Sequence, residues 1–250
     1  TDTERNYKLS VFSYEILPKY AVLDPELIMT APASIAASCG VDALIHAMEA
    51  YVSRNATPFS DAMAEKAMEL IGGNLRRFVA NRQDEEAACA MMLGSNFAGI
   101  SFAWARLGNV HAMSHPVSAF FDVAHGVANA ILLPAVVRYN ALSDRGKYYD
   151  IYCCVAKAPV EKERFEPGML AEELLALNKE LGIPGSLSLC SRPAGAVAPD
   201  SLSRSPLPSN GAFRSPPLWA PSPFSPEESD EKPPRAPPGR PWRRVSFPAS

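Results

Sequence analysis

Histidine is scarce in this sequence, with four residues among 250. Three of the four lie between Gly108 and Pro134, and the fourth is His46. Both stretches are rich in apolar residues, whereas histidines that only decorate a surface are expected among polar neighbours. The scarcity and the clustering together indicate a shared chemical role.

The sequence also lacks the marks of several protein classes. No G-x-G-x-x-G or comparable glycine-rich turn occurs in it, so no phosphate-binding turn is predicted. The formal charge of −3 gives no reason to expect nucleic acid or an anionic membrane as a partner. We expect a soluble chain without a membrane-length apolar run. Five cysteines, an odd number at no disulfide or zinc spacing, follow no signal peptide, which favours the cytoplasm.

What the sequence does contain is helical periodicity from Pro32 onward, interrupted at Gly40 and at Gly72-Gly73. At 47% hydrophobic residues, the chain can bury one sizeable core. Two β-branched and aromatic runs, Tyr7–Ser13 and Tyr20–Leu23, suit short strands. The predicted fold class is therefore mainly α. The helices are expected at Asp42–Ser53, Thr57–Leu70, Asn74–Asn81, Asp84–Leu107, Lys147–Lys157 and Met169–Leu181, and the apolar second half of Asp84–Leu107 is expected to be buried centrally.

Asp42 and His46 are four residues apart, so on a helix both side chains leave from one face. With Glu49 and Ser53 they could equally form the solvated polar stripe of an amphipathic helix. His111 and His115 repeat the four-residue spacing. Carboxylate oxygen and neutral imidazole are ligands for Fe²⁺ and Zn²⁺, so the set indicates a metal site.

His125 begins another helix, which continues over Val127–Tyr139. The amide end of a helix disfavours a protonated imidazole and so favours the form that binds metal. Pro116 cannot complete a helical hydrogen-bond ladder, and a kink or loop there would bring His111 and His125 together. Phe120 and Phe121 are expected to exclude water from the site.

The segments GVDALIHAMEAYVS and HAMSHPVSAFFDVAHGVANAILLP resemble the iron-containing (group III) alcohol dehydrogenase family, and the resemblance runs from about Lys8 to Ser188. It implies that Fe²⁺, or Zn²⁺ in some members, is held by Asp42, His46, His111 and His125. It also implies that His115 lies beside the metal and the nicotinamide, and that Lys8 contacts the NAD or NADP cofactor near the nicotinamide ribose.

The resemblance divides the chain into three parts. Residues 1–30 would be the remnant of an N-terminal α/β cofactor domain, and residues 31–188 the helical metal-binding domain of the dehydroquinate synthase-like fold. Such a protein would interconvert small alcohols and aldehydes, and dimers are common in the family. A related glycerol dehydrogenase or dehydroquinate synthase-like enzyme and an inactive helical metal-binding fragment are the alternatives.

Residues 189–250 differ sharply in composition from the rest, with fifteen of the twenty-four prolines and seven arginines against one lysine. Such a segment buries too little apolar surface to offset its chain entropy, so we expect it to be disordered. A shifted reading frame in a G+C-rich gene would give this mixture of residues. A proline-rich ligand for an aromatic groove, from PLPSNG or PPRAPPGRP, is the functional alternative.

The shifted-frame hypothesis makes a prediction about the gene. Translation in another frame after the Ser188 codon should restore an amphipathic helical sequence, because the resemblance stops there abruptly. Sequencing the gene checks this directly. Stop codons and patternless sequence in both other frames would contradict the hypothesis and favour an evolved tail.

Overall fold

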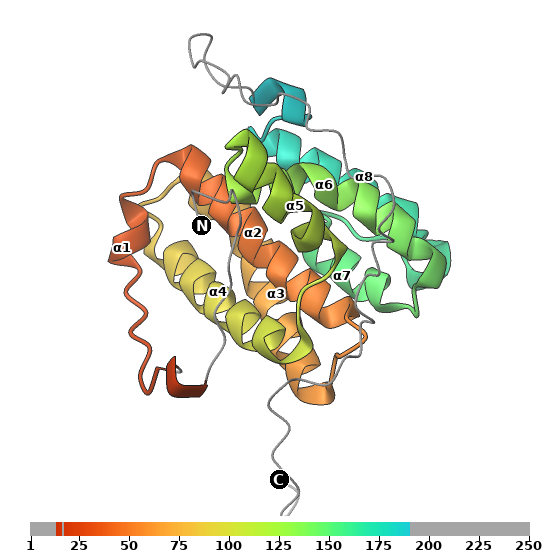
Figure 1. Cartoon of the computed structure of the whole chain (residues 1–250), viewed down its shortest axis with the longest axis horizontal. Coiled ribbons are helices and arrows are strands. Elements are labelled where there is room, and N and C mark those ends of the chain that lie inside the picture. Colours follow the sequence, from red (N-terminus) through yellow and green to blue (C-terminus); the bar gives the residue numbers. More distant parts are fainter. Residues whose placement is uncertain (1–13, 17, 191–250) are drawn as a thin grey trace, which may run out of the picture. The chain divides into compact units, whose positions relative to one another are not determined.

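A computed structural model describes residues 14–16 and 18–190, and these form a bundle of helices without a strand (Figure 1). The predicted mainly α class is therefore confirmed. The Tyr7–Ser13 run, Lys8 and residues 191–250 lie outside the described residues. The α-helices are α1 Glu26–Met29, α2 Ala33–Val52, α3 Pro58–Ala80, α4 Glu85–Ala105, α5 Asn109–Phe121, α6 His125–Asn140, α7 Lys147–Val155 and α8 Pro167–Glu180.

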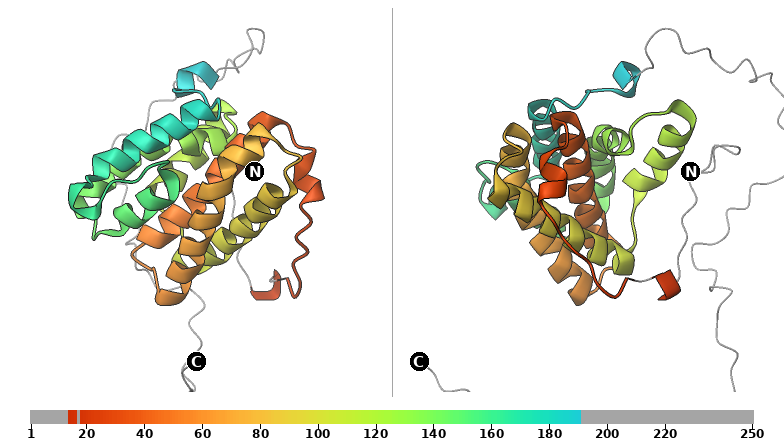
Figure 2. Two further views of the ribbon diagram at one scale, coloured as in Figure 1. Left: turned by 180° about the vertical axis from the view of Figure 1, so that it is seen from behind. Right: turned by 90° about the vertical axis from the view of Figure 1, so that its left-hand side faces the viewer.

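Helix α2 is the centre of the bundle. It contacts α3 and α4 on one side and α6 on the other, with α5 and α8 packed against α6 (Figures 1 and 2). Its buried apolar residues include Val41, Leu44 and Ile45, none of which is exposed at all. An α-helix that is apolar on most of its circumference needs neighbours on most sides, and α2 has them.

Local sequence signals explain where the helices on one side of α2 begin. Thr57 caps α3 by accepting a hydrogen bond from the Ser60 amide, and Pro58 takes the first helical position. Asp84 caps α4 through the Ala87 amide at 3.0 Å, and acidic residues follow in the first turn. Short polar signals at 57–60 and 84–87 thus position the two helices that flank α2.

Four expectations about local structure are wrong. Tyr20–Leu23 is not a strand: Tyr20 and Val22 are each 89% exposed, and the described residues offer no neighbouring strand to pair with. The helices also continue through Gly40 and through Gly72-Gly73, because a buried helix outweighs a glycine penalty of about 1 kcal/mol. A 3₁₀ turn, Leu187–Cys190, runs two residues past the expected boundary at Ser188.

Helix α4 is not buried centrally, contrary to expectation. In its second half Trp104 is 65% exposed, since α4 packs mainly against α2 and α3. Two helices, α2 and α4, are also long and apolar enough to cross a membrane by length and composition alone, which contradicts the expected absence of such a run. Length and composition alone are weak evidence for a membrane span. Most of the apolar stretch of α2, 72% of it, is buried inside the bundle, as in the core helix of a soluble protein.

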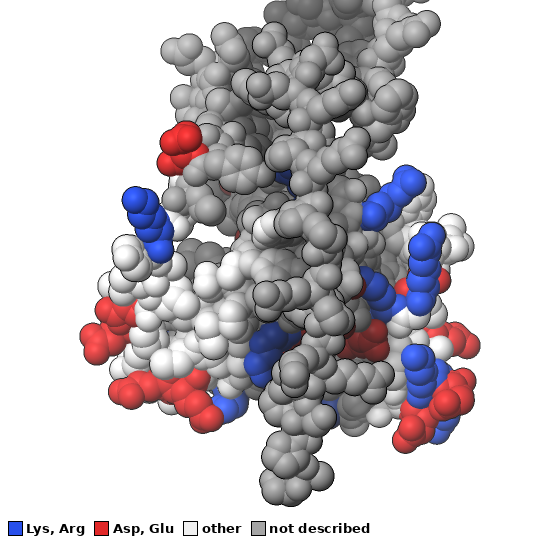
Figure 3. Space-filling model, turned by 90° about the horizontal axis from the view of Figure 1, so that it is seen from below, with Lys and Arg blue, Asp and Glu red and all other residues white. Residues whose placement is uncertain are grey.

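Charged side chains of both signs are interspersed along the edges of the face shown in Figure 3. Ion pairs between charged side chains join some of the elements, such as Arg77 with Asp84 at 2.9 Å and Arg76 with Glu180 at 2.7 Å. Exposed pairs of this kind contribute little to stability, about 0–1 kcal/mol each. The bundle is held by its apolar core.

Two adjacent glycines in α3 give a matched test of the packing. A Cβ on Gly72 would lie 2.0 Å from the Cys154 carbonyl oxygen of α7, whereas one on Gly73 would meet nothing within 4 Å. Gly72→Ala should destabilise the chain by about 1–3 kcal/mol because α7 must move. Gly73→Ala should stabilise it by about 0.5–1 kcal/mol. Urea unfolding of both variants measures this, and equal stabilities would contradict the close contact.

Candidate metal centre

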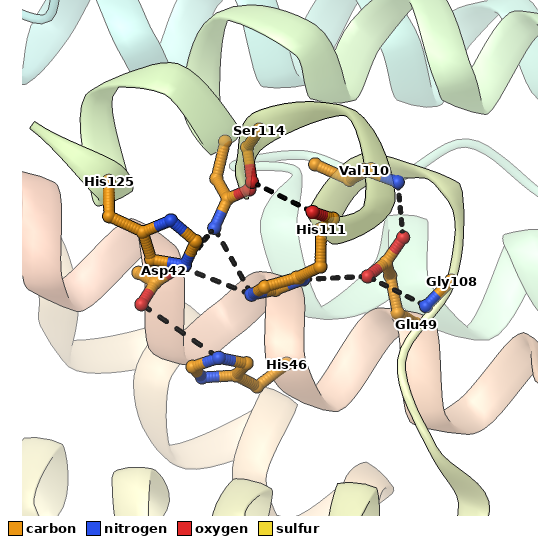
Figure 4. A network of polar contacts seen from close by, with 9 residues as sticks. Asp42, His46, Glu49, Gly108, Val110, His111, Ser114 and His125 are labelled. Carbon is orange, nitrogen blue, oxygen red and sulfur yellow. Dashed lines mark hydrogen bonds and ion pairs between the residues drawn. The ribbon is translucent and has the colours of Figure 1, made fainter. Parts of the chain in front are cut away.

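The candidate site lies where α2 faces the hairpin formed by α5 and α6 (Figure 4). Asp42, His46 and Glu49 point from one face of α2 because they are spaced by four and three residues. Helix α5 brings His111, and α6 begins with His125. A Cβ on Gly126 would lie 2.3 Å from the Ser38 carbonyl oxygen, so the glycine lets the start of α6 approach α2 closely.

Three of the four predicted ligands converge. One donor atom from each of Asp42, His111 and His125 lies within 4.8 Å of the others. The Asp42 Oδ1 atom is 3.5 Å from His111 Nε2 and 3.8 Å from His125 Nε2. Only His111 is fully buried, while Asp42 and His125 keep side-chain exposures of 17% and 25%. The cluster is therefore partly open to a small molecule.

The other two histidines lie beside this cluster. His46 Nε2 is 3.8 Å from the second carboxylate oxygen of Asp42, and its ring stacks on that of His111 with centroids 4.6 Å apart. The His115 ring lies 5.2 Å from that of His125 and 5.9 Å from that of His111. All four histidines thus gather in one place, although His46 is not among the three residues whose donor atoms converge.

Asn129 is a site residue that the sequence reasoning missed. Its Nδ2 atom donates to Asp42 Oδ1 at 2.5 Å and lies 3.1 Å from the Nε2 atoms of both His111 and His125. The Asn129 Nδ2 atom thus lies between the donor atoms of Asp42, His111 and His125. Asn129 follows His125 by four residues, and this helical spacing was the signal that could have identified it.

Glu49 was the second omission. It was read as part of a stripe, but its side chain is 6% exposed and is hydrogen-bonded to α5 and the preceding loop. The solvated-stripe alternative is therefore wrong for this face of α2. Its position seven residues after Asp42, two helical turns along the same face, was available in the sequence.

Two expectations about the hairpin are also wrong. Helix α5 continues through Pro116 and ends at Phe121, so the turn that brings His125 back is formed by residues 122–124, with Asp122 in the left-handed conformation. A proline costs one helical hydrogen bond and does not force a loop. Phe120 and Phe121 are 67% and 68% exposed, so they point away from the site instead of shielding it.

The metal-free site distributes its charges unevenly. Burial by itself would lower the pKa of His111. Hydrogen bonds with the carboxylates of Asp42 and Glu49 outweigh burial and raise the pKa to about 9. Burial raises the pKa of Asp42, yet its contacts with His111, His46 and Asn129 outweigh this and bring it to about 2. Burial also lowers the pKa of His46 despite the Asp42 carboxylate nearby. These shifts favour the protonated form of His111 and the neutral form of His46 at neutral pH.

The residues present fit a divalent cation. One carboxylate and imidazole nitrogens form the donor set that Fe²⁺ and Zn²⁺ accept. The three donors already converge, and Asp42 stays ionised over the whole neutral range. The Asn129 Oδ1 atom is buried and has no hydrogen-bond partner among the described residues. A buried amide oxygen without a hydrogen-bond partner calls for an explanation. Here the amide lies between Asp42, His111 and His125, and this arrangement favours a cation site at that position.

Comparisons with known proteins agree with this chemistry. A profile described as "Fe-containing alcohol dehydrogenase family, C-terminal" matches residues 36–190. Lactaldehyde reductase from Escherichia coli (strain K12) is 42% identical over 189 residues, covering 75% of this chain and 49% of that protein. 1,3-Propanediol dehydrogenase from Klebsiella pneumoniae is 44% identical over 151 residues, covering 60% and 39%. A crystal structure of 1,3-propanediol oxidoreductase superposes with a TM-score of 0.61 at 40% identity, covering 67% of this chain and 44% of that one.

The charge distribution predicts how the metal-free protein titrates. The pKa of His111 should lie near 9 and that of His46 below 6.5. Because the folded pKa of His111 is the higher one, its contribution to stability is complete below about pH 6.5 and is lost as the pH rises through about 9. Imidazole NMR resonances of chelator-treated protein, followed against pH, measure both values. A His111 midpoint at or below that of His46 would contradict the prediction.

Proposed function

Because the chain belongs to the Fe-containing alcohol dehydrogenase family, we propose that it forms the metal-binding half of an NAD(P)-dependent oxidoreductase that interconverts small alcohols and aldehydes. The chain spans about half the length of the curated relatives it matches. The observation that carries the proposal is the convergence of Asp42, His111 and His125 at the open edge of the helical bundle.

We propose that Asp42, His46, His111 and His125 hold the metal. Asp42, His111 and His125 supply the converging donors, and His46 Nε2 lies 3.8 Å from Asp42 Oδ2, with its ring stacked on that of His111. Fe²⁺ is the ion that the family name indicates. Zn²⁺ binds the same donor types and usually more tightly than Fe²⁺, so the ion found in purified protein will also reflect supply.

A divalent ion at this position supplies a Lewis acid that lowers the pKa of an alcohol oxygen. The protein positions the reactants: Asp42 adds negative charge at the site, and the partly exposed edge around His125 admits a small substrate. We propose that His115, whose ring centroid lies 5.2 Å from that of His125, would orient a nicotinamide or relay a proton. A bound nicotinamide would supply the hydride-accepting chemistry.

The cofactor and substrate are proposed in general terms. NAD or NADP would be bound largely by residues beyond those described, including Lys8, which lies outside the described part of the chain. The named activities of relatives, a lactaldehyde reductase and a 1,3-propanediol dehydrogenase, concern short oxygenated alcohols and aldehydes. A substrate of about this size is therefore proposed for this chain as well.

Two histidine variants test the proposed roles. His125→Ala should weaken Fe²⁺ and Zn²⁺ binding by more than the roughly 10- to 100-fold that loss of an outer-shell partner costs. His115→Ala should leave metal affinity nearly unchanged and lower turnover only. Metal titration of chelator-treated protein measures the first effect. Equal loss of metal in both variants would contradict the assignment.

Activity is measured separately, by mixing metal-loaded protein with NAD⁺ or NADP⁺ and a panel of C2 to C4 alcohols. Formation of reduced nicotinamide, followed by its absorbance, supports the oxidoreductase proposal for this chain. Tight metal binding without any turnover would favour the alternative of an inactive metal-binding fragment.

A further inference from the structure

We infer that Glu49 is a positioning residue: it orients His111 toward the metal and fixes the loop from which helix α5 begins. The inference rests on the proposed metal site. Glu49 touches neither Asp42 nor His125 in the described contacts, so its role would be exerted through its neighbours.

The contacts of Glu49 are directed to one element of the hairpin. Its Oε2 atom is 2.7 Å from His111 Nδ1 and accepts the Gly108 amide at 3.0 Å (Figure 4). Its Oε1 atom accepts the Val110 amide at 2.7 Å. A buried carboxylate is costly unless donors surround it, and here three donors do so.

The contact with His111 determines which ring nitrogen is available. A carboxylate can only accept, so the Nδ1 atom that faces it must carry a hydrogen. The Nε2 atom is then left to face Asp42 at 3.5 Å, with its lone pair free for a ligand once its own proton leaves. A carboxylate behind a metal-binding histidine fixes the tautomer and the ring orientation in this way.

The two backbone contacts hold a strained turn. Arg106, between α4 and α5, has φ 70 and ψ 172, a backbone conformation that is strained for a residue other than glycine. Two residues later the backbone passes so close to Glu49 that a Cβ on Gly108 would lie 2.9 Å from Oε1. The amide hydrogen bonds of Gly108 and Val110 to one carboxylate offset that strain and set where α5 starts.

Glutamine cannot reproduce these contacts. With its oxygen at the Oε2 position, the new amino group would face the Val110 amide hydrogen, and donor would meet donor. With its oxygen at the Oε1 position, the amino group would face Gly108 and His111 Nδ1, and the ring would need its hydrogen on Nε2. That second arrangement places a hydrogen where the metal should bind.

The test compares Glu49→Gln with Ser101→Ala. Ser101 is also buried, and its hydroxyl donates one hydrogen bond, to the Ser60 carbonyl at 2.8 Å, which joins α4 to α3 and involves no residue of the hairpin. Zn²⁺ affinity is measured by titration against a competing chelator, together with the melting temperature. We expect Glu49→Gln to weaken Zn²⁺ binding by roughly 10- to 100-fold. Ser101→Ala should lower the melting temperature without a comparable loss of Zn²⁺.

Two further readouts separate positioning from stability. Hydrogen exchange of the Gly108 and Val110 amides in metal-free protein should accelerate in Glu49→Gln and not in Ser101→Ala. Imidazole nitrogen NMR of Zn²⁺-loaded protein should show metal on His111 Nε2 in the wild type and a weakened preference in Glu49→Gln. If Glu49→Gln does not fold, Gly108→Ala keeps the carboxylate but crowds it, and a smaller loss of Zn²⁺ affinity is expected.

The outcomes distinguish the inference from the proposed function. Wild-type protein that fails to bind Zn²⁺ or Fe²⁺ would overturn the metal site, and unchanged amide exchange in Glu49→Gln would then overturn the positioning role as well. Tight binding by the wild type and equally tight binding by Glu49→Gln would overturn the inference alone. A loss of Zn²⁺ in Ser101→Ala as large as that in Glu49→Gln would likewise reduce the role of Glu49 to stability.

Discussion

Polar side chains on one face of a buried helix must find their partners inside the protein, and this constraint arranges the bundle around α2. Asp42 and Glu49 stand on that face, and each is satisfied by groups from the α5–α6 hairpin. Leaving either carboxylate without partners would cost several kcal/mol, comparable to the whole stability of a domain. The hairpin is therefore held against α2 by its polar contacts as well as by apolar packing.

The carboxylates of Asp42 and Glu49 have different partners. Asp42 faces the open edge, where its oxygens meet three imidazoles and the Asn129 amide. Glu49 is buried, and its described hydrogen bonds go to His111 and to the Gly108 and Val110 amides. The Asp42 carboxylate thus faces the proposed metal position, and the Glu49 carboxylate faces His111, a proposed ligand of that metal. His111, which contacts Glu49, is also the most deeply buried of the four histidines, at 2% exposure.

The sequence predicted features that depend on the spacing of residues along a helix, but it did not predict which side chains are buried in the folded protein. The spacing of Asp42 and His46 and the helical patterns beginning at Thr57 and Asp84 depend on local sequence. Helices are present at all three places, although α2 and α3 continue through the glycines where interruptions were expected. Burial of Glu49 depends on the hairpin that covers it, and no local pattern contains that information. The same reason explains the exposed Phe120 and Phe121 and the uncovered face of α4, since apolar character shows only that burial is favourable.

The donors of this centre come from distant parts of the chain: Asp42 and Asn129, which meet within hydrogen-bond distance, are 87 positions apart. During synthesis α2, α3 and α4 therefore leave the ribosome with the two α2 carboxylates lacking their partners. Only after α6 has been made can the site close. A nascent chain cannot hold a metal ion in this site before that point, so capture of the ion would act as a late checkpoint, adding its binding energy only to chains in which the hairpin has docked.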